Sequence, residues 1–256
     1  MTPYWEDDDA GLALYVGDMR EVLPALDVTA DVVVTDPPYG ETSLAWDRWP
    51  DGWPALAATV ASSMWCFGSM RMFLQQRDQF TDWKLSQDVV WEKNAGTGIA
   101  TDRFRRIHEH ALHWYRGVPW SQIHHEAQRT KAAPSDRSHG AGAPNTVHRK
   151  TTGAHIGDRA PHLWVDDGTR LMTSLIRAKN LRGKATHPTE KPLGILDPLI
   201  RYACPEGGLV VDPFAGSGST LDAARQSGRR AIGIEADERY AEQIALRLSA
   251  LTLPAA

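Results

Sequence analysis

A short apolar run ends in an acidic, proline-rich turn that holds the first residues able to do chemistry. Residues 30–35 have the character of a buried strand and are followed directly by Asp36, Pro37, Pro38 and Tyr39. Two prolines cannot continue a sheet ladder, so the chain must leave the sheet there with a stiff backbone. Asp36 and Tyr39 are therefore expected at the carboxyl end of a strand, which is where open α/β sheets bind ligands.

The chemistry of this turn suits a planar amine as substrate. The carboxylate of Asp36 and the carbonyl of Pro37 can accept the two N–H bonds of an exocyclic amino group, which directs its lone pair toward an electrophile. The Tyr39 ring can stack on a base that has been turned out of a duplex. The alternative is a proline-stiffened structural turn in which Tyr39 only covers the surface.

A glycine-rich turn late in the chain is the second candidate site. Residues 209–211 predict a buried strand, and a turn leading into a helix follows it, with Gly216 and Gly218 at its centre. Such glycines let the backbone approach a nucleotide-type ligand at a helix N-terminus. Glu235 ends the next predicted strand, roughly twenty residues later, where an acid accepts hydrogen bonds from ribose hydroxyls. No lysine follows Gly218 and the full dinucleotide glycine pattern is missing, which excludes a P-loop and disfavours NAD or FAD.

A sheet is needed to position both turns, and the hydrophobic pattern predicts one. Strands are expected at residues 12–16, 31–35, 63–67, 88–91, 110–115, 209–211 and 231–234, and helices at 53–62, 192–202, 220–226 and 238–251. Strands that alternate with helices predict an α/β sheet covered on both faces. Residues 118–160 break this rhythm with many Gly, Pro, Ser, His and Arg residues. They form either a solvated loop or a substrate-recognition insertion, and the basic residues crowded between 125 and 185 favour the insertion.

Composition limits the class of protein. The chain has 256 residues, of which 42% are hydrophobic, enough for one domain that carries an insertion. A net charge of −4 argues against a protein that coats nucleic acid by bulk electrostatics, although a local basic patch can still bind phosphates. No apolar run approaches the roughly 20 residues of a membrane span, and the acidic start is unlike a signal peptide, so a soluble, cytoplasmic protein is expected. Cys66 and Cys204 are expected to be reduced core thiols.

The order of these motifs resembles that of the DNA amino-methyltransferase family in the permuted arrangement called the β class. That family places its Asp-Pro-Pro-Tyr motif first, its recognition region next and its Phe-x-Gly-x-Gly cofactor motif last, as here with residues 36–39 and 214–218. Residues 187–192 match the family's His-Pro-Thr-x-Lys-Pro element, which opens a helix beside the methionine end of the cofactor. Gly17 and Asp18 resemble its upstream acidic cofactor contact. Residues 91–94 and 108–112 resemble the strand segments that precede its recognition region.

The resemblance implies a Rossmann-like, S-adenosylmethionine-dependent methyltransferase fold: a mostly parallel twisted sheet with an antiparallel last strand and an inserted target-recognition region. Residues 1–117 would form the catalytic half, 118–182 the recognition insertion and 183–256 the cofactor-binding half. Glu235 would bind the ribose and Asp18 would lie near the adenine. The complete set of implied cofactor residues is Asp18, Thr189, Lys191, Pro192, Asp212, Pro213, Phe214, Ala215, Gly216, Ser217, Gly218, Thr220 and Glu235.

The resemblance also implies the reaction: methyl transfer from S-adenosylmethionine to an exocyclic amine of double-stranded DNA, with base flipping and with Asp36, Pro37, Pro38 and Tyr39 as the catalytic motif. In the family, Asp at the first catalytic position usually accompanies adenine N6 methylation and Ser usually accompanies cytosine N4. Adenine N6 is therefore expected, with cytosine N4, an RNA methyltransferase and a non-catalytic nucleic-acid-binding relative as alternatives. The resemblance further admits a homodimer and a cognate restriction enzyme as partners.

Several residues have simpler alternatives. Asp18 could do no more than cap a helix over residues 19–26. Residues 189–192 could be only a helix start, with Lys191 as a solvated charge. The histidines at 108, 110 and 113 share one predicted strand, and packing or DNA contact is preferred for them over a metal site, since no ordered carboxylate or cysteine partners accompany them.

Overall fold

The computed structural model describes residues 1–93, 101–131, 167–179 and 190–252. These residues fall into two compact units. The first unit comprises residues 1–126 and 174–256, and the second comprises residues 127–173. The first unit contains both motifs that the sequence singles out.

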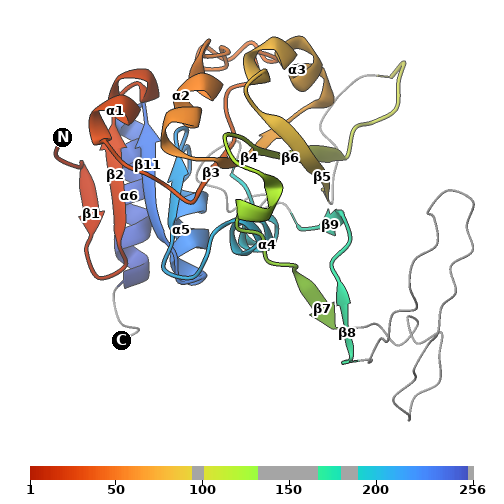
Figure 1. Ribbon diagram of the computed structural model, residues 1–256. Coiled ribbons are helices and arrows are strands. Elements are labelled where there is room, and N and C mark those ends of the chain that lie inside the picture. The colour runs from red at the N-terminus through yellow and green to blue at the C-terminus, as the bar shows by residue number, and fades with distance from the viewer. Residues whose placement is uncertain (94–100, 132–166, 180–189, 253–256) are drawn as a thin grey trace, which may run out of the picture. The chain divides into compact units, whose positions relative to one another are not determined.

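A nine-stranded sheet forms the centre of the first unit (Figure 1), in the order β1-β2-β11-β10-β3-β4-β6-β5-β9. Its strands are β1 (Trp5–Asp7), β2 (Leu12–Val16), β3 (Val32–Thr35), β4 (Ser63–Gly68), β5 (Lys84–Glu92), β6 (His108–Tyr115), β9 (Leu175–Arg177), β10 (Leu209–Asp212) and β11 (Arg230–Glu235). All of them except β1 and β6 run in the same direction. The expected mostly parallel sheet is therefore confirmed.

The antiparallel strand expected in this fold is β6, which lies between β4 and β5 and is antiparallel to both. The last strand of the chain, β11, is instead parallel to both of its neighbours, β10 and β2. The direction of β6 follows from its connection. β5 and β6 are consecutive in the chain and adjacent in the sheet, and neighbouring strands joined in this way commonly form an antiparallel pair.

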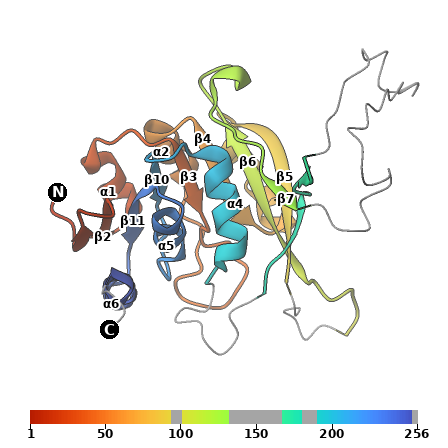
Figure 2. The same ribbon diagram turned by 90° about the horizontal axis from the view of Figure 1, so that it is seen from below.

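Helices cover both faces of the sheet. They are α1 (Met19–Leu26), α2 (Trp53–Val60), α3 (Met70–Gln75), α4 (Leu193–Ala203), α5 (Ser219–Gln226) and α6 (Glu238–Thr252), with short 3-10 turns η1 (Arg77–Phe80) and η2 (Trp120–Gln122). The views in Figures 1 and 2 place α1, α2 and α3 on one face and α4, α5 and α6 on the other. No helix in the described parts of the chain is long and apolar enough to cross a membrane.

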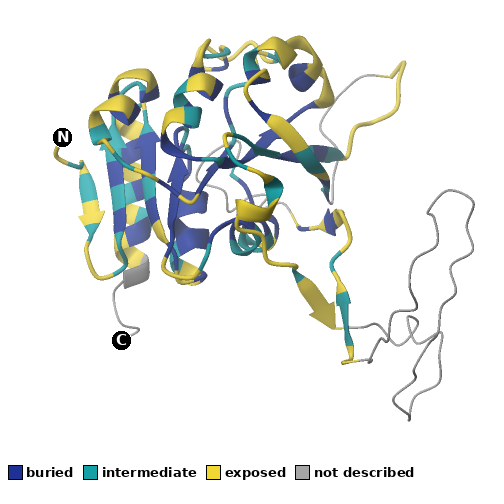
Figure 3. Cartoon of the chain, viewed as in Figure 1, coloured by how far each residue is buried: buried dark blue, intermediate teal, exposed yellow. Residues whose placement is uncertain are grey.

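The central strands are mostly apolar, as expected for strands that helices cover on both sides. Figure 3 shows them as the buried middle of the unit, and every residue of β3, β4 and β10 is buried. Cys66 and Cys204 are both buried and free. Burial raises the pKa of the Cys66 thiol, and it raises that of Cys204 to about 12. The prediction of two reduced core thiols is confirmed.

The second unit contains a short antiparallel pair of strands, β7 (Arg129–Lys131) and β8 (Thr169–Leu171). The Arg129 guanidinium donates to the Thr169 hydroxyl at 2.6 Å and pairs with Asp167 at 3.4 Å. The insertion expected from the sequence, residues 118–182, is wider than this unit. Residues 118–126 and 174–179 belong to the first unit, where β9 joins the main sheet beside β5. Residues 132–166 and 180–182 lie outside the described residues.

Candidate functional site

The two sequence motifs meet at one edge of the sheet. β3 leads into Asp36, β10 ends at Asp212, and β11 ends at Glu235, all at the carboxyl ends of adjacent parallel strands. The turns that follow such strands converge on a common crevice. A cavity of about 280 Å³ lies there. It is lined by Gly17, Asp18, Met19, Asp36, Pro38, Trp46, Arg48, Pro50, Lys191, Asp212, Pro213, Phe214, Ala215, Gly216, Ser217, Ser219, Thr220, Ile234, Glu235, Ala236, Asp237 and Tyr240.

Most of the residues that the sequence assigned to the site line this cavity, and four lie just outside its wall. Gly218 precedes the first residue of α5, and Pro192 precedes the first residue of α4. Pro37 is buried in the turn after β3, and the hydroxyl of Tyr39 contacts Asp36. Thr189 lies outside the described residues.

Glu235 fixes the glycine-rich turn from across the cavity. Its carboxylate accepts hydrogen bonds from the backbone N–H of Gly216 at 2.8 Å and of Asp237 at 2.9 Å. Burial raises the pKa of Glu235, and these backbone hydrogen bonds oppose that change. Gly216 has φ 55° and Gly218 has φ 73°, a left-handed conformation that glycine adopts without strain. The turn thereby brings bare backbone against the cavity.

Asp212 is the most deeply buried carboxylate on the cavity wall, with a residue exposure of 3%. It accepts hydrogen bonds from the Thr35 hydroxyl and from the backbone N–H of Phe214, both at 3.1 Å. Burial raises its pKa to about 6, although the hydrogen bonds, including one from Thr220, lower it, and the nearby Asp36 adds a smaller upward contribution. The residue ties the end of β10 to the end of β3 and starts the glycine-rich turn.

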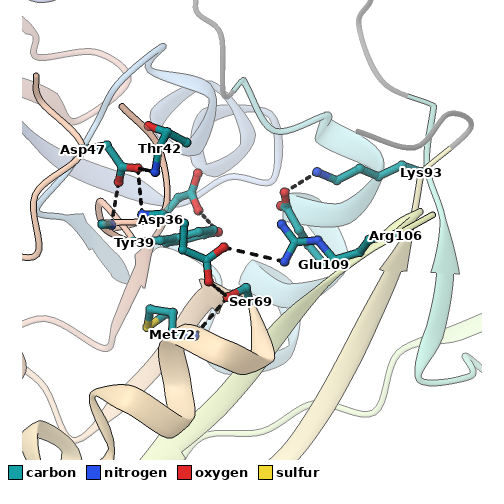
Figure 4. A network of polar contacts seen from close by, with 11 residues as sticks. Asp36, Tyr39, Thr42, Asp47, Ser69, Met72, Lys93, Arg106 and Glu109 are labelled. Atoms are coloured by element: carbon teal, nitrogen blue, oxygen red, sulfur yellow. Dashed lines mark hydrogen bonds and ion pairs between the residues drawn. The ribbon is translucent and has the colours of Figure 1, made fainter. Parts of the chain in front are cut away.

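Asp36 has a partner on each carboxylate oxygen. Its Oδ1 accepts a hydrogen bond from the Tyr39 hydroxyl at 2.5 Å, and its Oδ2 pairs with the Lys191 ammonium group. Lys191 also lies 3.4 Å from Glu109 of β6, whose other oxygen pairs with Lys93. Figure 4 shows the contact of Tyr39 with Asp36 and that of Lys93 with Glu109. We call these five residues, Lys93, Glu109, Lys191, Asp36 and Tyr39, the charge chain.

Burial and neighbouring charges have competing effects on the pKa values of residues in the charge chain. Burial lowers the pKa of Lys191, but the carboxylates of Asp36 and Glu109 outweigh it and raise that pKa. Burial raises the pKa of Glu109, but Lys191 and Lys93 outweigh it and lower that pKa. Burial, followed by the charges of Asp36 and Glu109, raises the pKa of Tyr39, so its hydroxyl remains a donor. Lys191 is buried and ion-paired, and the alternative that it is a solvated charge is wrong.

The turn after Tyr39 is held by Asp47, a residue that the sequence gave no reason to select. Its buried carboxylate accepts backbone N–H hydrogen bonds from Gly40 at 2.7 Å, Glu41 at 3.0 Å and Thr42 at 2.7 Å, as Figure 4 shows in part. Burial raises the pKa of Asp47, but hydrogen bonds from Thr42, Gly40 and Glu41 together lower it. This carboxylate acts as the anchor of the loop between residues 36–39 and α2.

Asp18 lies at the start of α1 and beside the cavity. It caps α1 by accepting a hydrogen bond from the backbone N–H of Arg20 at 2.8 Å, so the capping alternative is confirmed. It also lines the cavity. Other lining residues had not been selected from the sequence: Met19, Trp46, Arg48, Pro50, Ser219, Ile234, Ala236, Asp237 and Tyr240. Of these, Met19, Ser219, Ile234, Ala236 and Asp237 lie within two positions of selected residues in the sequence, whereas Trp46, Arg48, Pro50 and Tyr240 do not.

The walls of the cavity are rich in carboxylates. Asp18, Asp36, Asp212, Glu235 and Asp237 face Arg48 and Lys191 there, beside the apolar rings of Phe214 and Tyr240. Carboxylates accept hydrogen bonds from hydroxyl and ammonium groups, and apolar rings cover a planar base. The wall therefore suits a positively charged nucleoside with free hydroxyls.

The histidines of β6 differ in their surroundings. His113 is buried, lies 3.0 Å from the Ser63 hydroxyl and packs on Trp65 with 4.7 Å between ring centroids. Burial lowers its pKa to about 3, so it is neutral, and the packing role is confirmed for this residue. His108 and His110 line a second cavity. Within the described ranges, no group of three or more His, Cys, Asp or Glu side chains is arranged to hold a metal ion.

Comparison with known proteins gives the family. A family model of N6/N4 methyltransferases, which is described as DNA methylase, matches residues 30–246. The Type II methyltransferase M.ScaI of Streptomyces caespitosus is 25% identical over 97% of this chain and 84% of its own length. A protein named "Putative methylase YubD", from Escherichia coli (strain K12), is 54% identical over 69 residues, which are 27% of this chain and 30% of that protein.

Solved structures share the fold. M1.HpyAVI in complex with SAM matches with a TM-score of 0.58 at 20% identity, over 92% of this chain and 99% of that one. The cytosine-N4-specific PvuII DNA methyltransferase matches with a TM-score of 0.58 at 15% identity, over 93% of this chain and 86% of that one. The expected methyltransferase fold is confirmed by these matches. Because the family model spans most of the chain, including both motifs of the site, the chain belongs to the DNA methylase family of N6/N4 methyltransferases.

Proposed function

We propose that this protein transfers a methyl group from S-adenosylmethionine to the N6 amino group of adenine in double-stranded DNA. The observation that carries the proposal is the position of Asp36, whose carboxylate lies on the wall of the acidic cavity and next to Tyr39. An acceptor for the substrate amine thereby adjoins a site suited to a cationic nucleoside. Membership of the DNA methylase family supports the substrate class.

The cavity residues fit this cofactor. S-adenosylmethionine supplies an electrophilic methyl group on a positively charged sulfur. Glu235 would accept hydrogen bonds from the ribose hydroxyls, Asp18 would lie near the adenine, and Lys191 would lie near the methionine end. The bare backbone at Gly216 permits close approach, and the carboxylates on the wall balance the positive charge of the ligand.

Asp36 would orient the substrate amine rather than ionise it. In the structure its Oδ1 is occupied by the Tyr39 hydroxyl and its Oδ2 by Lys191. We infer that the incoming amine replaces the Tyr39 hydroxyl on Oδ1 while the Tyr39 ring turns to stack on the flipped base. The amine proton becomes acidic only after the nitrogen has gained its methyl group, so Asp36 receives that proton late. Lys191 would stay paired with Oδ2 during this exchange.

Adenine is proposed over cytosine because the first catalytic residue is Asp36, and Asp at this position usually accompanies adenine N6 methylation in the family that the sequence resembles. The fold similarity to the cytosine-N4-specific PvuII enzyme keeps cytosine N4 as the second candidate. Both bases present the amino group on a six-membered ring, which in adenine is fused to a second ring, and the same turn could orient either one.

The test is methylation of unmethylated genomic DNA by the purified chain with labelled S-adenosylmethionine, followed by nucleoside mass spectrometry. N6-methyladenine is the expected product. N4-methylcytosine would refute the base assignment and retain the mechanism. If RNA but not DNA becomes labelled, or if the cofactor binds and no nucleic acid is methylated, the proposed function is wrong.

The role of Asp36 has its own test. Asp36→Ala is expected to retain cofactor binding, measured by calorimetry, and to lose methyl transfer to DNA by at least 100-fold, the usual lower range for a residue that positions a reacting group. Asp78→Ala provides the matched control, because Asp78 is an exposed aspartate on η1 that does not line the cavity. Substantial turnover by Asp36→Ala would contradict the role proposed for this carboxylate.

A further inference from the structure

The connection between β5 and β6 emerges at the same edge of the sheet as the catalytic turn. β5 runs with the parallel set and ends at Glu92, whereas β6 is antiparallel and starts at His108. The end of β5 and the start of β6 therefore lie at the carboxyl edge, where β3 leads into Asp36. The described part of the connection, residues 101–107, projects beyond both strands in Figures 1 and 2, where it is drawn in yellow-green.

A second cavity, of about 370 Å³, lies beneath this segment and has basic walls. It is lined by Arg103, Phe104, Arg105 and Arg106 of the segment, by Met70 and Arg71 of α3, and by Glu41, Ser69, His108 and His110. Glu41 is the single carboxylate among these described lining residues. α3 starts just after the carboxyl end of β4, so all these residues belong to one edge of the same unit.

Two of the four arginines are balanced by acids and two are not. Arg103 pairs with Asp102 at 2.6 Å, and Arg106 lies 3.7 Å from Glu41. Neither Arg71 nor Arg105 has a carboxylate partner among the described residues. An excess of unpaired guanidinium groups attracts an anionic partner and favours phosphate, because the planar guanidinium donates two parallel hydrogen bonds.

Phe104 indicates which anionic partner fits. Its exposure is 102%, so it makes almost no contact with the rest of the chain, and it stands between Arg103 and Arg105. Met70 and Ile107 are also exposed beside it. An aromatic ring between cations is suited to binding a nucleic acid, which combines phosphates with stacked bases. In such complexes, apolar side chains enter base steps while arginines hold the backbone.

This surface is joined to the catalytic turn through Glu41. Glu41 follows Asp36 by five residues, accepts a hydrogen bond from the Ser69 hydroxyl and lies 3.7 Å from Arg106. We propose that Arg71 and residues 103–106 form a DNA-docking surface, in which the arginines bind phosphates beside the target base and Phe104 inserts into the stack that the base leaves. This inference rests on the proposed function, because the DNA that docks here is the substrate of the proposed methyl transfer.

The phosphate part is tested by the salt dependence of binding to duplex DNA. Arg105→Ala removes one contact, so the slope of log K against log salt should become less steep by about 0.9, and affinity at 0.1 M salt should fall about eightfold. The matched control is Lys84→Ala, which also removes one exposed cation but at the amino end of β5, the opposite edge of the sheet. Equal effects of the two substitutions would overturn the proposal.

The insertion of Phe104 into the base stack, which we call the wedge, is tested by photocrosslinking and by turnover. A benzophenone amino acid at position 104 should crosslink to duplex DNA, and the same group at position 85, an exposed leucine beside Lys84, should not. Phe104→Ala should keep cofactor affinity and lose at least tenfold in methyl transfer to duplex DNA. Crosslinking at 104 no greater than at 85, or unchanged turnover, would overturn the wedge.

Failure of the inference and failure of the proposed function give different results. If the unaltered chain methylates DNA but the variants at 104 and 105 behave like their controls, only the docking surface is wrong. If the unaltered chain transfers no methyl group to DNA, the proposed function itself is wrong. Crosslinking of position 104 to RNA in preference to duplex DNA would assign the surface to another partner and overturn the inference.

Discussion

Lys191 is the residue whose burial most affects the site. Its buried ammonium group lies between the carboxylates of Asp36 and Glu109. Each of these charges would be costly to bury alone, and each is acceptable because its partner is present. The carboxylate of Asp36 is therefore held in place by a lysine that lies 155 residues away in the sequence.

Replacing this lysine should destabilise the fold as well as the site. Lys191→Gln leaves two buried carboxylates without their shared cation, and the free energy of unfolding should fall by about 3–5 kcal/mol. Adding Glu109→Gln removes one of those charges, so the double variant should lose less than the sum of the single losses. Urea unfolding measures all three variants. Lys84→Gln, at an exposed position, should change stability by no more than about 0.5 kcal/mol.

Asp212 predicts a pH dependence of stability. Its pKa is about 6 in the folded chain against 3.8 for the free side chain, so the folded state binds more protons between these values. The contribution of this residue to stability is complete below about pH 4 and is lost as the pH rises through 6. The total is about 3 kcal/mol, at about 1.4 kcal/mol per pKa unit.

Asp212→Asn removes that titration. Relative to the unaltered chain, the variant should gain stability as the pH rises from about 4 to 6 and keep that gain above 6, measured by urea unfolding at several pH values. Comparing the two chains at each pH cancels the titration of every other group. A stability difference that does not vary across this range would contradict the raised pKa.

At the scale of elements, the start of α5 depends on a glycine with no room for a side chain. Gly218 has φ 73°, and a Cβ atom there would lie 2.6 Å from Cγ2 of Ile244 on α6. Gly52 precedes α2 with φ 83° and has no atom within 4 Å of the same position. The two helix starts thus share the backbone conformation and differ only in the space around it.

This difference predicts unequal costs for the same substitution. Gly52→Ala should lower the free energy of unfolding by about 1 kcal/mol, the conformational cost alone. Gly218→Ala should cost about 1–3 kcal/mol more, because the new methyl group overlaps Ile244. Urea unfolding of the two variants provides the comparison. Equal losses would show that α6 can move away from α5 freely.

Elements with a strong apolar pattern could be predicted from the sequence. The strand expected at residues 12–16 is observed as Leu12–Val16, and the helix expected at 238–251 is observed as Glu238–Thr252. Elements without such a pattern were missed. β9 has three residues and exists because it pairs with β5, and α3 has six residues and follows a buried strand. The expected strand at 88–91 was too short, since the first half of β5 is largely exposed and polar.

The same division applies to the site. Asp36, Glu235 and the glycine-rich turn adjoin predicted strands, and their roles follow from local position. Asp47 binds the backbone across a loop whose path the sequence does not reveal, and Glu109 pairs with lysines from two distant segments. Contacts of this kind depend on the assembled sheet, so periodicity and spacing contain no signal for them.

At the scale of the whole molecule, the chain enters and leaves its second unit at points anchored to the first. The backbone N–H of Glu126 donates to the Tyr202 carbonyl at 2.8 Å, and that of Val90 donates to the Ser174 carbonyl at 2.7 Å. These bonds hold the two residues that flank 127–173 within the first unit, which contains the sheet and the acidic cavity.

Removing the second unit should separate cofactor binding from methylation of DNA. A chain with residues 127–173 replaced by a flexible Gly/Ser linker should bind S-adenosylmethionine within about threefold of the full chain, because every residue that lines the cavity remains. It should no longer methylate the DNA sites of the full chain, because the insertion is expected to read them. Calorimetry and sequencing of methylated sites are the measurements. An unchanged set of methylated sites would contradict the recognition role.

The buried thiols also make the protein suitable for site-specific chemical labelling. The sequence contains two cysteines, and both are enclosed in the core with raised pKa values. A maleimide dye reacts with exposed thiolates, so the folded chain should give almost no background. A cysteine introduced at a surface position would then be the only fast-reacting one, and a fluorophore pair could follow the approach of the chain to a labelled duplex without any cysteine having to be removed.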